Sequence, residues 1–211
     1  MHPPEAQLVK LAQQGDRAAL GTLLNHHHQR LFNVALRMVG HRDDAAEITQ
    51  DAMLKIVEHI KNYDGRSQLT TWMIRIVMNL SISHLRKRKL RKAASLDADS
   101  GNGGGPIARG DGNDAALRDR LVDDRERKPD ERVQHEEMIA ELHRALGRLD
   151  EEFRSVLVLR DMNDMDYEQI ADALSVPVGT VKSRLFRARL ALRQEMLKAF
   201  PDADVQPAKQ S

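Results

Sequence analysis

The sequence predicts an all-α fold made of two small helical domains joined by a flexible linker. Three observations support this fold class. Leu, Ala, Arg, Glu and Gln are abundant while β-branched residues are few, and aromatic residues are only 3% of the chain. Apolar residues recur at helical spacing in both halves of the sequence. A glycine-rich stretch, 101–105, separates these halves, and 211 residues give room for two domains.

The first half, residues 1–92, is predicted to be one helical domain. A short apolar stripe at Leu8, Leu11 and Ala12 ends at Gly15. A long helix follows and stops at Gly40. The predicted N-caps of the longer helices are Asp16, then Asp43 or Asp44, then Thr70 or Thr71. The middle one is expected to bury a single face made of Ile48, Ala52, Ile56, Val57 and Ile60.

Residues 93–134 are predicted to be a flexible linker. The segment contains Gly101 to Pro106 and a stretch rich in Asp and Arg with few apolar residues. A helical turn is expected only near Ala115 to Val122. The second domain then covers 135–200, and residues 201–211 form a tail.

The second domain carries a helix-turn-helix pattern. Asp150 and Asp166 are predicted to cap successive helices, and the turn from Ser175 to Thr180 contains Pro177. The short helix before the turn is expected to pack inward through Ile170, Ala171 and Leu174. The helix after it presents basic and polar residues, which suits insertion into a DNA major groove. An amphipathic helix with a solvated basic face is the alternative reading of the same pattern.

A second candidate surface for nucleic acid lies around residues 62–72. Tyr63 and Trp72 flank a loop that contains Gly65 and Arg66, and a basic block follows at 86–92. Aromatic and cationic groups around a loop suit the capture of unpaired bases. Trp72 also lies at core spacing, and basic residues at a helix C-terminus suit the helix dipole, so a structural role remains open for both.

Composition excludes several other classes. The chain has no cysteine, so it has no disulfide framework and no thiolate metal site. His26, His27 and His28 would point about 100° apart on a helix and cannot converge on one ion, so no metal and no cofactor is predicted. No apolar run reaches the roughly 18 residues that span a bilayer. No catalytic motif is visible, and we expect no enzyme. The 33 basic and 32 acidic residues nearly cancel, so the charge distribution is more informative than the net charge of +1.

With these motifs in place, the sequence resembles the extracytoplasmic-function (group 4) sigma factors of bacterial RNA polymerase, of the sigma-E-like kind. Three segments carry the resemblance: the acidic run 44–51, the stretch from Gly65 to Arg86 with Thr71-Trp72 and Asn79, and Pro177 to Arg189. It implies a region 2 helical bundle in 1–92 and a region 4 helix-turn-helix in 135–200. It also implies a cytoplasmic protein that binds core RNA polymerase, through the β′ clamp helices and the β flap, and promoter DNA. A separate anti-sigma factor is a further expected partner.

The resemblance assigns roles to particular residues. Contact with polymerase is implied for Asp44, Glu47, Gln50 and Asp51. Contact with the −10 element is implied for Tyr63, Asp64, Gly65, Arg66, Ser67, Gln68, Trp72, Asn79, Arg86, Lys87 and Arg88. In the −35 major groove it implies Lys182, Ser183, Phe186 and Arg187, and on the −35 phosphates Thr180, Arg184 and Arg189.

The linker length constrains how two DNA sites could be bound together. Promoter elements two DNA turns apart lie ~70 Å from each other. A flexible coil of about 40 residues spans roughly 35 Å on average but reaches about 130 Å when extended. The two domains therefore need something to hold them apart. Two rival functions remain open: a helix-turn-helix regulator that acts without polymerase, and an adaptor that binds no DNA.

Overall fold

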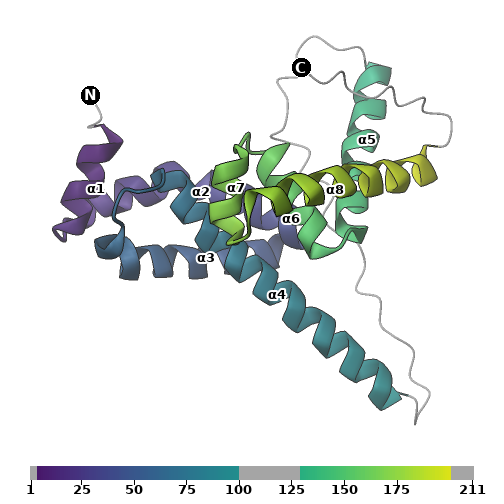
Figure 1. Ribbon diagram of the computed structural model, residues 1–211, viewed down its shortest axis with the longest axis horizontal. Coiled ribbons are helices and arrows are strands. Elements are labelled where there is room, and N and C mark those ends of the chain that lie inside the picture. The colour runs from purple at the N-terminus through teal and green to yellow at the C-terminus, as the bar shows by residue number, and fades with distance from the viewer. Residues whose placement is uncertain (1–3, 100–128, 201–211) are drawn as a thin grey trace.

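The structure, a computed structural model, describes residues 4–99 and 129–200, and within these ranges every regular element is a helix. The elements are α1 (Glu5–Gln13), α2 (Arg17–Val39), α3 (Arg42–His59), the 3-10 turn η1 (Ile60–Asn62), α4 (Leu69–Asp99), α5 (Pro129–Arg148), α6 (Glu151–Arg160), α7 (Tyr167–Leu174) and α8 (Val178–Ala199). The predicted all-α fold class is confirmed. We call α1–α4 the N-terminal bundle and α5–α8 the C-terminal bundle (Figure 1).

Two boundaries of α2 follow directly from the sequence. The Asp16 carboxylate accepts hydrogen bonds from the backbone N–H groups of Ala18 and Ala19, at 2.8 and 3.1 Å. It thereby satisfies two donors that have no partner inside the helix. Gly40 ends the helix in the left-handed conformation with φ 74°, where a residue without Cβ is least strained. The predicted cap and stop of this helix are confirmed.

Two other predicted caps are wrong by two or three residues. Helix α3 begins at Arg42 after an extended His41, so Asp43 and Asp44 lie inside its first turn. There their charge favours the helix through its dipole without capping a backbone donor. Helix α4 begins at Leu69, because the Trp72 N–H already bonds the Gln68 carbonyl at 3.0 Å. The Thr70 and Thr71 positions are therefore helical as well.

Helices also reach into the segment 93–134, predicted as a linker, from both of its ends. Helix α4 continues to Asp99, since neither glycine nor proline interrupts the sequence before Gly101. Helix α5 begins at Pro129, a residue suited to the first helical position. The glycine-rich run and the turn predicted near Ala115 to Val122 lie outside the described residues.

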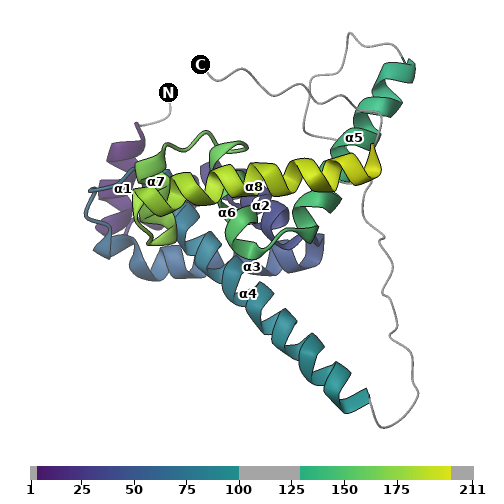
Figure 2. The same ribbon diagram turned by 45° about the vertical axis from the view of Figure 1, so that its right-hand side comes forward.

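The N-terminal bundle is organised around α2, which packs against α1, α3 and α4. In the C-terminal bundle α8 packs against α5, α6 and α7. The later part of α4 projects away from the rest of the molecule in both views (Figures 1 and 2). Its basic block therefore lies on a protruding rod.

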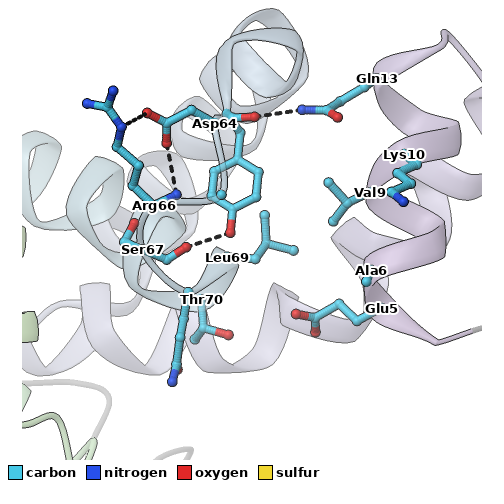
Figure 3. Close-up of a pocket in the computed structure, with 13 residues that line it drawn as sticks. Glu5, Ala6, Val9, Lys10, Gln13, Asp64, Arg66, Ser67, Leu69 and Thr70 are labelled. Atoms are coloured by element: carbon cyan, nitrogen blue, oxygen red, sulfur yellow. Dashed lines mark hydrogen bonds and ion pairs between the residues drawn. The ribbon is translucent and has the colours of Figure 1, made fainter.

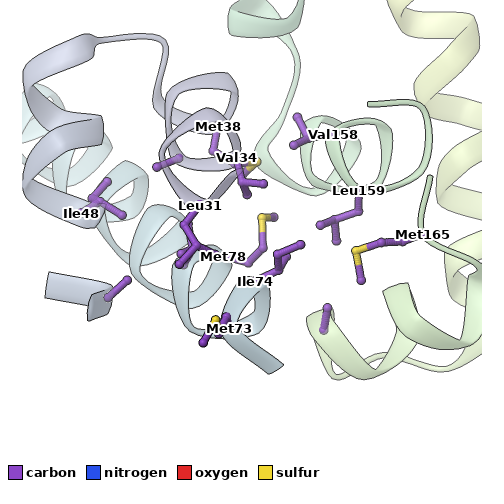
Figure 4. Close-up of a cluster of buried hydrophobic side chains, with 14 of the residues drawn as sticks. Leu31, Val34, Met38, Ile48, Met73, Ile74, Met78, Val158, Leu159 and Met165 are labelled. Carbon is purple, nitrogen blue, oxygen red and sulfur yellow. The ribbon is translucent and has the colours of Figure 1, made fainter. Parts of the chain in front are cut away.

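The two bundles share one hydrophobic core rather than standing apart. Helix α4 packs against α7, and α2 packs against α6. Figure 4 shows Ile74 and Met78 of α4 facing Leu159 and Met165 of the C-terminal bundle, all of them buried. Burial of this apolar surface stabilises the contact between the bundles. The expectation that something holds the two domains apart refers to the chain bound at two promoter elements; in the chain alone the bundles are in contact.

Candidate nucleic-acid interface

The helix-turn-helix is built from α7, the turn at 175–177 and α8. Asp166 and Gln169 form a reciprocal capping box at the start of α7, with bonds of 2.8 and 3.0 Å. Ser175 ends α7 in the left-handed conformation, and Pro177 precedes the first residue of α8. Ile170 is fully buried, while Ala171 and Leu174 are partly buried. Ala173 is buried too, although the sequence pattern did not single it out.

Helix α8 has one buried face and one exposed face. Val181, Leu185 and Ala188 pack into the core at spacings of four and three residues. Between them, the exposed positions are Lys182, Ser183, Phe186 and Arg187. Phe186 is 68% exposed, which is unusual for an aromatic side chain in a helix that has an apolar core to join. The four residues predicted to enter the major groove therefore share an accessible surface.

The residues predicted to contact −35 phosphates are partly engaged within the protein. Arg184 lies 2.9 Å from a carboxylate oxygen of Glu152. Arg189 holds both oxygens of Asp161, at 2.6 and 3.2 Å, and this hydrogen bonding raises its pKa. Thr180 is the third residue of α8 and does not cap it. Phosphate contacts by either arginine would replace an existing ion pair.

The loop from Tyr63 to Gln68 is held in a defined shape by its own side chains. The Tyr63 hydroxyl donates to the Ser67 carbonyl at 2.6 Å and closes the loop. The Asp64 carboxylate accepts from the Arg66 backbone N–H at 3.0 Å and lies 3.1 Å from its guanidinium. Gly65 has φ 74°, a left-handed conformation that suits glycine. The loop is thus preorganised without a ligand.

A cavity of about 630 Å³ lies between this loop and α1 (Figure 3). Its walls are the residues from Tyr63 to Thr70 and, across from them, side chains of α1 that include Glu5, Lys10 and Gln13. The Gln13 amide donates to the carbonyls of Ile60 and Tyr63, at 3.1 and 2.7 Å. It thereby ties α1 to the start of the loop. Nothing in the sequence pattern of α1 indicated this role, because only the fold brings residues about 50 positions apart together.

Trp72 and Asn79, both predicted for the −10 element, are not part of the cavity wall. The Trp72 ring is partly buried against Tyr63, with centroids 5.4 Å apart and planes tilted by 46°. Trp72 therefore supports Tyr63 from the core side. Asn79 is exposed further along α4 and is not among the lining residues.

The basic residues at 86–88 are exposed on the part of α4 that leaves the bundle (Figure 2). Arg86 bonds Glu151 of the C-terminal bundle at 2.8 Å, and that hydrogen bond raises its pKa. Arg88 approaches Asp44 at 3.8 Å, while Lys87 forms no ion pair among the described residues. The positive charge of this block is therefore only partly compensated.

Helix α3 presents an exposed stripe of acidic, polar and apolar residues. Glu47, Gln50 and Asp51 are exposed, and Leu54, 57% exposed, continues the same face one turn later. Val57 is 42% exposed, so its predicted place in the buried face is wrong. The fourth predicted polymerase contact, Asp44, is only partly accessible, because it bonds His84 at 3.2 Å. Leu54 was not predicted, although an apolar residue four positions after Gln50 was a usable signal.

Polar contacts join the two bundles around their shared core. Arg75 of α4 bonds Asp172 at 3.0 Å and the Ser175 hydroxyl at 2.8 Å. The buried Arg154 guanidinium donates to the Met38 carbonyl of α2, and also to the carbonyls of Gly147 and Leu149 at 2.7 and 3.0 Å. Burial lowers the pKa of Arg154. Arg30 and Arg37 donate across the same boundary to the carbonyls of Asn163 and Met162.

Residues 4–99 and 129–200 contain no group of three or more His, Cys, Asp or Glu side chains placed to hold an ion. His27 is buried and lies 3.2 Å from Glu5. Within the same ranges no helix is both long enough and apolar enough to cross a bilayer.

The folded chain is thus a two-bundle helical protein with a helix-turn-helix, an exposed basic face on its second helix, and a separate preorganised loop. Residues 23–91 match Sigma-70 region 2, and residues 139–192 match Sigma-70, region 4. The RNA polymerase sigma-H factor of Pseudomonas aeruginosa is 31% identical over 203 residues, which cover 94% of this chain and 97% of that protein. The sigma factor SigW of Bacillus subtilis is 28% identical over 188 residues, covering 89% and 94%.

Solved structures show the same fold. The sigma factor RpoE of Bartonella quintana, in complex with the anti-sigma factor NepR, has a TM-score of 0.58 and 24% identity, covering 84% of this chain and 96% of that one. CnrH, in complex with the cytosolic domain of CnrY, has a TM-score of 0.57 and 23% identity, covering 93% and 96%. The chain belongs to the sigma-70 family, in its extracytoplasmic-function group. It is therefore a sigma factor, a subunit that binds core RNA polymerase and directs transcription initiation at promoters.

Proposed function

We propose that the two bundles divide promoter recognition between them, with 1–92 acting on polymerase and the −10 element and 135–200 on the −35 element. The observation that carries this proposal is the exposed face of α8 in a helix-turn-helix. Lys182 and Arg187 offer N–H donors, and Phe186 offers an apolar surface for a thymine methyl group. The Ser183 hydroxyl donates to the Thr180 carbonyl at 3.0 Å, which leaves its oxygen as an acceptor. The flanking phosphates are contacted by Thr180 and by Arg184 and Arg189. For this, each arginine leaves its carboxylate partner and binds a phosphate instead.

The cavity between α1 and the loop is the proposed site for an unpaired −10 base. A volume of about 630 Å³ is ample for one nucleotide, and its walls carry charged and amide side chains able to bind a base edge. Because the loop is already closed by Tyr63 and Asp64, little ordering is required when the base enters. Arg86, Lys87 and Arg88 then hold phosphates at the adjacent duplex edge. Trp72 contributes by packing against Tyr63, and Asn79 contributes from further along α4.

The exposed stripe of α3 is the proposed contact with the β′ clamp helices of core polymerase. Glu47, Gln50 and Asp51 supply charge and hydrogen bonds, and Leu54 with Val57 supplies an apolar centre of the kind that dominates protein interfaces. Asp44 contributes less to this contact, because its carboxylate lies 3.2 Å from the His84 imidazole. Contact between the C-terminal bundle and the β flap is part of the same proposal.

Simultaneous use of both DNA-binding surfaces requires the bundles to separate. In the structure α4 touches α7 directly, whereas promoter elements two DNA turns apart lie ~70 Å from each other. The Arg86–Glu151 ion pair also engages a side chain proposed for DNA. We infer that binding to core polymerase opens this contact and extends the segment between the bundles.

An anti-sigma factor is the proposed regulatory partner, and the cytoplasm the proposed location. Of the two solved structures of this fold, one contains the sigma factor RpoE with the anti-sigma factor NepR, and the other contains CnrH with the cytosolic domain of CnrY. We further infer that the chain performs no catalysis of its own, and that transcription chemistry belongs to the core enzyme.

Run-off transcription with purified core polymerase on a genomic promoter library tests the proposed function. Specific transcripts that depend on both the chain and the core enzyme are expected. A regulator that acts without polymerase would bind a duplex on its own and give no such dependence. An adaptor would give no DNA dependence at all.

A further inference from the structure

The aromatic ring of Tyr167, the first residue of α7, lies against two cations. The Arg160 guanidinium at the end of α6 is 5.2 Å from the ring centroid, and the Lys182 ammonium of α8 is 5.5 Å from it. Both distances fall within the range of a cation–π interaction. The ring therefore links the helix before the turn to the helix that follows it.

The ring is a fixed element of this cluster, while Lys182 is its mobile member. Tyr167 is partly buried against the core, and the capping box at Asp166 holds the backbone just before it. Arg160 is held in turn by a 2.9 Å bond to the Met165 carbonyl. Lys182, in contrast, is exposed and carries its charge on a flexible four-carbon chain.

Lys182 also differs from Arg184 and Arg189 in having no carboxylate partner among the described residues. Arg184 and Arg189 on the same helix each hold an acid, Glu152 and Asp161. For Lys182 the described part of the chain supplies the Tyr167 ring instead. The ring is thus the group that orients it.

We propose that Tyr167 is a positioning residue that holds the Lys182 ammonium over its ring and directs it toward a base edge of the −35 element. This inference rests on the proposed role of Lys182 in the major groove. The ammonium has three N–H donors, and those pointing away from the ring remain available to guanine acceptors. Restricting the side chain before binding reduces the entropy cost when the base contact forms.

The test uses the full chain bound to core polymerase. It is mixed with a pool of promoter duplexes in which the −35 element is randomised. Every duplex carries the same −10 element, taken from a promoter identified by run-off transcription. Sequencing of the bound fraction gives the base preference at every position. Lys182→Met should relax the preference at one position. Tyr167→Leu should weaken the preference at that same position about 2- to 5-fold, the effect of removing one exposed cation–π interaction. Tyr167→Phe keeps the ring and should retain the base preference at that position. Tyr167→Leu combined with Lys182→Met should weaken this preference no more than Lys182→Met does alone.

Three results would overturn the inference while leaving the role of Lys182 intact. The first is an unchanged base preference in Tyr167→Leu. The second is an equally weakened preference in Tyr167→Phe, which would assign the effect to the hydroxyl. The third is a preference weakened uniformly at all positions in Tyr167→Leu, which would indicate a structural effect. If Lys182→Met itself changes no preference, the proposed role of Lys182 fails and the inference falls with it.

Discussion

Arg154 shows how much one side chain contributes to this molecule. Its guanidinium is buried and donates to three backbone carbonyls, one of them in α2 and two where α5 ends before α6. These three bonds, made by Nη1 and Nη2, offset part of the cost of burying the charge, while Nε has no hydrogen-bond partner among the described residues. The residue therefore stabilises both the local turn before α6 and the contact between the bundles.

Replacing Arg154 with Met should destabilise the chain by about 2–4 kcal/mol, because buried carbonyls lose a charged donor. Urea unfolding followed by circular dichroism measures the change. Arg17→Met, at an exposed arginine of α2, is the matched control and should change stability little. Equal stability of the two variants would contradict the role given to Arg154.

The proposed division of function is also testable at single residues. Lys182→Ala combined with Arg187→Ala should weaken binding of a −35 duplex by roughly 1–3 kcal/mol for each base interaction removed, and should leave binding to core polymerase unchanged. Asp51→Ala should weaken binding to core polymerase and leave binding of the −35 duplex unchanged, because Asp51 lies on the exposed face of α3. Fluorescence anisotropy with labelled duplex and with core enzyme measures both. An equal reduction of both activities in either variant would refute the division.

At the scale of elements, α5 is joined to α8 by a chain of charges. Glu141 accepts from Arg148 at 2.6 Å and from Arg144 at 2.7 Å, and Arg148 also bonds Glu195 of α8 at 2.6 Å. Hydrogen bonds from Arg148 and Arg144 lower the pKa of Glu141. The pKa of Glu195 is lowered by Lys198 and Arg148. These carboxylates stay ionised in the folded state at a pH where they would be protonated in the unfolded chain.

This network predicts a pH dependence of stability. A carboxyl whose pKa is lowered by folding contributes stability that is present above its unfolded pKa and disappears as the pH falls through the folded value. Glu141→Gln should therefore lower the melting temperature near neutral pH, and its difference from the unmodified chain should shrink in acid. Melting curves across this range measure it. A difference independent of pH would show that packing, not charge, is responsible.

At the scale of the whole molecule, the closed contact between the bundles has a functional consequence. The core that joins Ile74 and Met78 to Leu159 and Met165 is apolar, while its margin holds the pair formed by Arg75 and Asp172. An exposed ion pair contributes only about 0–1 kcal/mol. Separation of the bundles is therefore opposed mainly by the free energy of exposing this apolar surface to water. Binding to a large polymerase surface can supply that energy.

Labels on an otherwise cysteine-free chain can follow this opening. Asn25→Cys on α2 and Gln194→Cys on α8, both at exposed positions, place one probe on each bundle. The free chain should show a single distance fixed by the contact between the bundles, and core polymerase with promoter DNA should replace it by one longer by tens of ångströms. Energy transfer between dyes measures the change. A distance unchanged by polymerase would refute the proposed separation.

The local plan of the chain was readable from residues alone. Asp16, Gly40 and Asp166 marked helix ends because caps and left-handed stops depend on neighbours a few positions away. The helix-turn-helix and the exposed face of α8 followed from periodicity for the same reason. The caps expected at Asp43 and Thr70 failed because several residues there could begin a helix, and packing selected an earlier one.

Which surfaces meet could not be predicted from local sequence patterns. The exposure of Leu54 and Val57, the place of α1 in the wall of the loop cavity, and the contact of Arg154 with α2 all depend on segments distant in sequence. Helical periodicity states which residues share a face, but it does not state what that face will touch. By itself, the sequence determined the helices, their order and the family to which the chain belongs. Burial of apolar surface between α4 and α7 decided that the two bundles rest against each other, because that contact removes more apolar area from water than two separate bundles could.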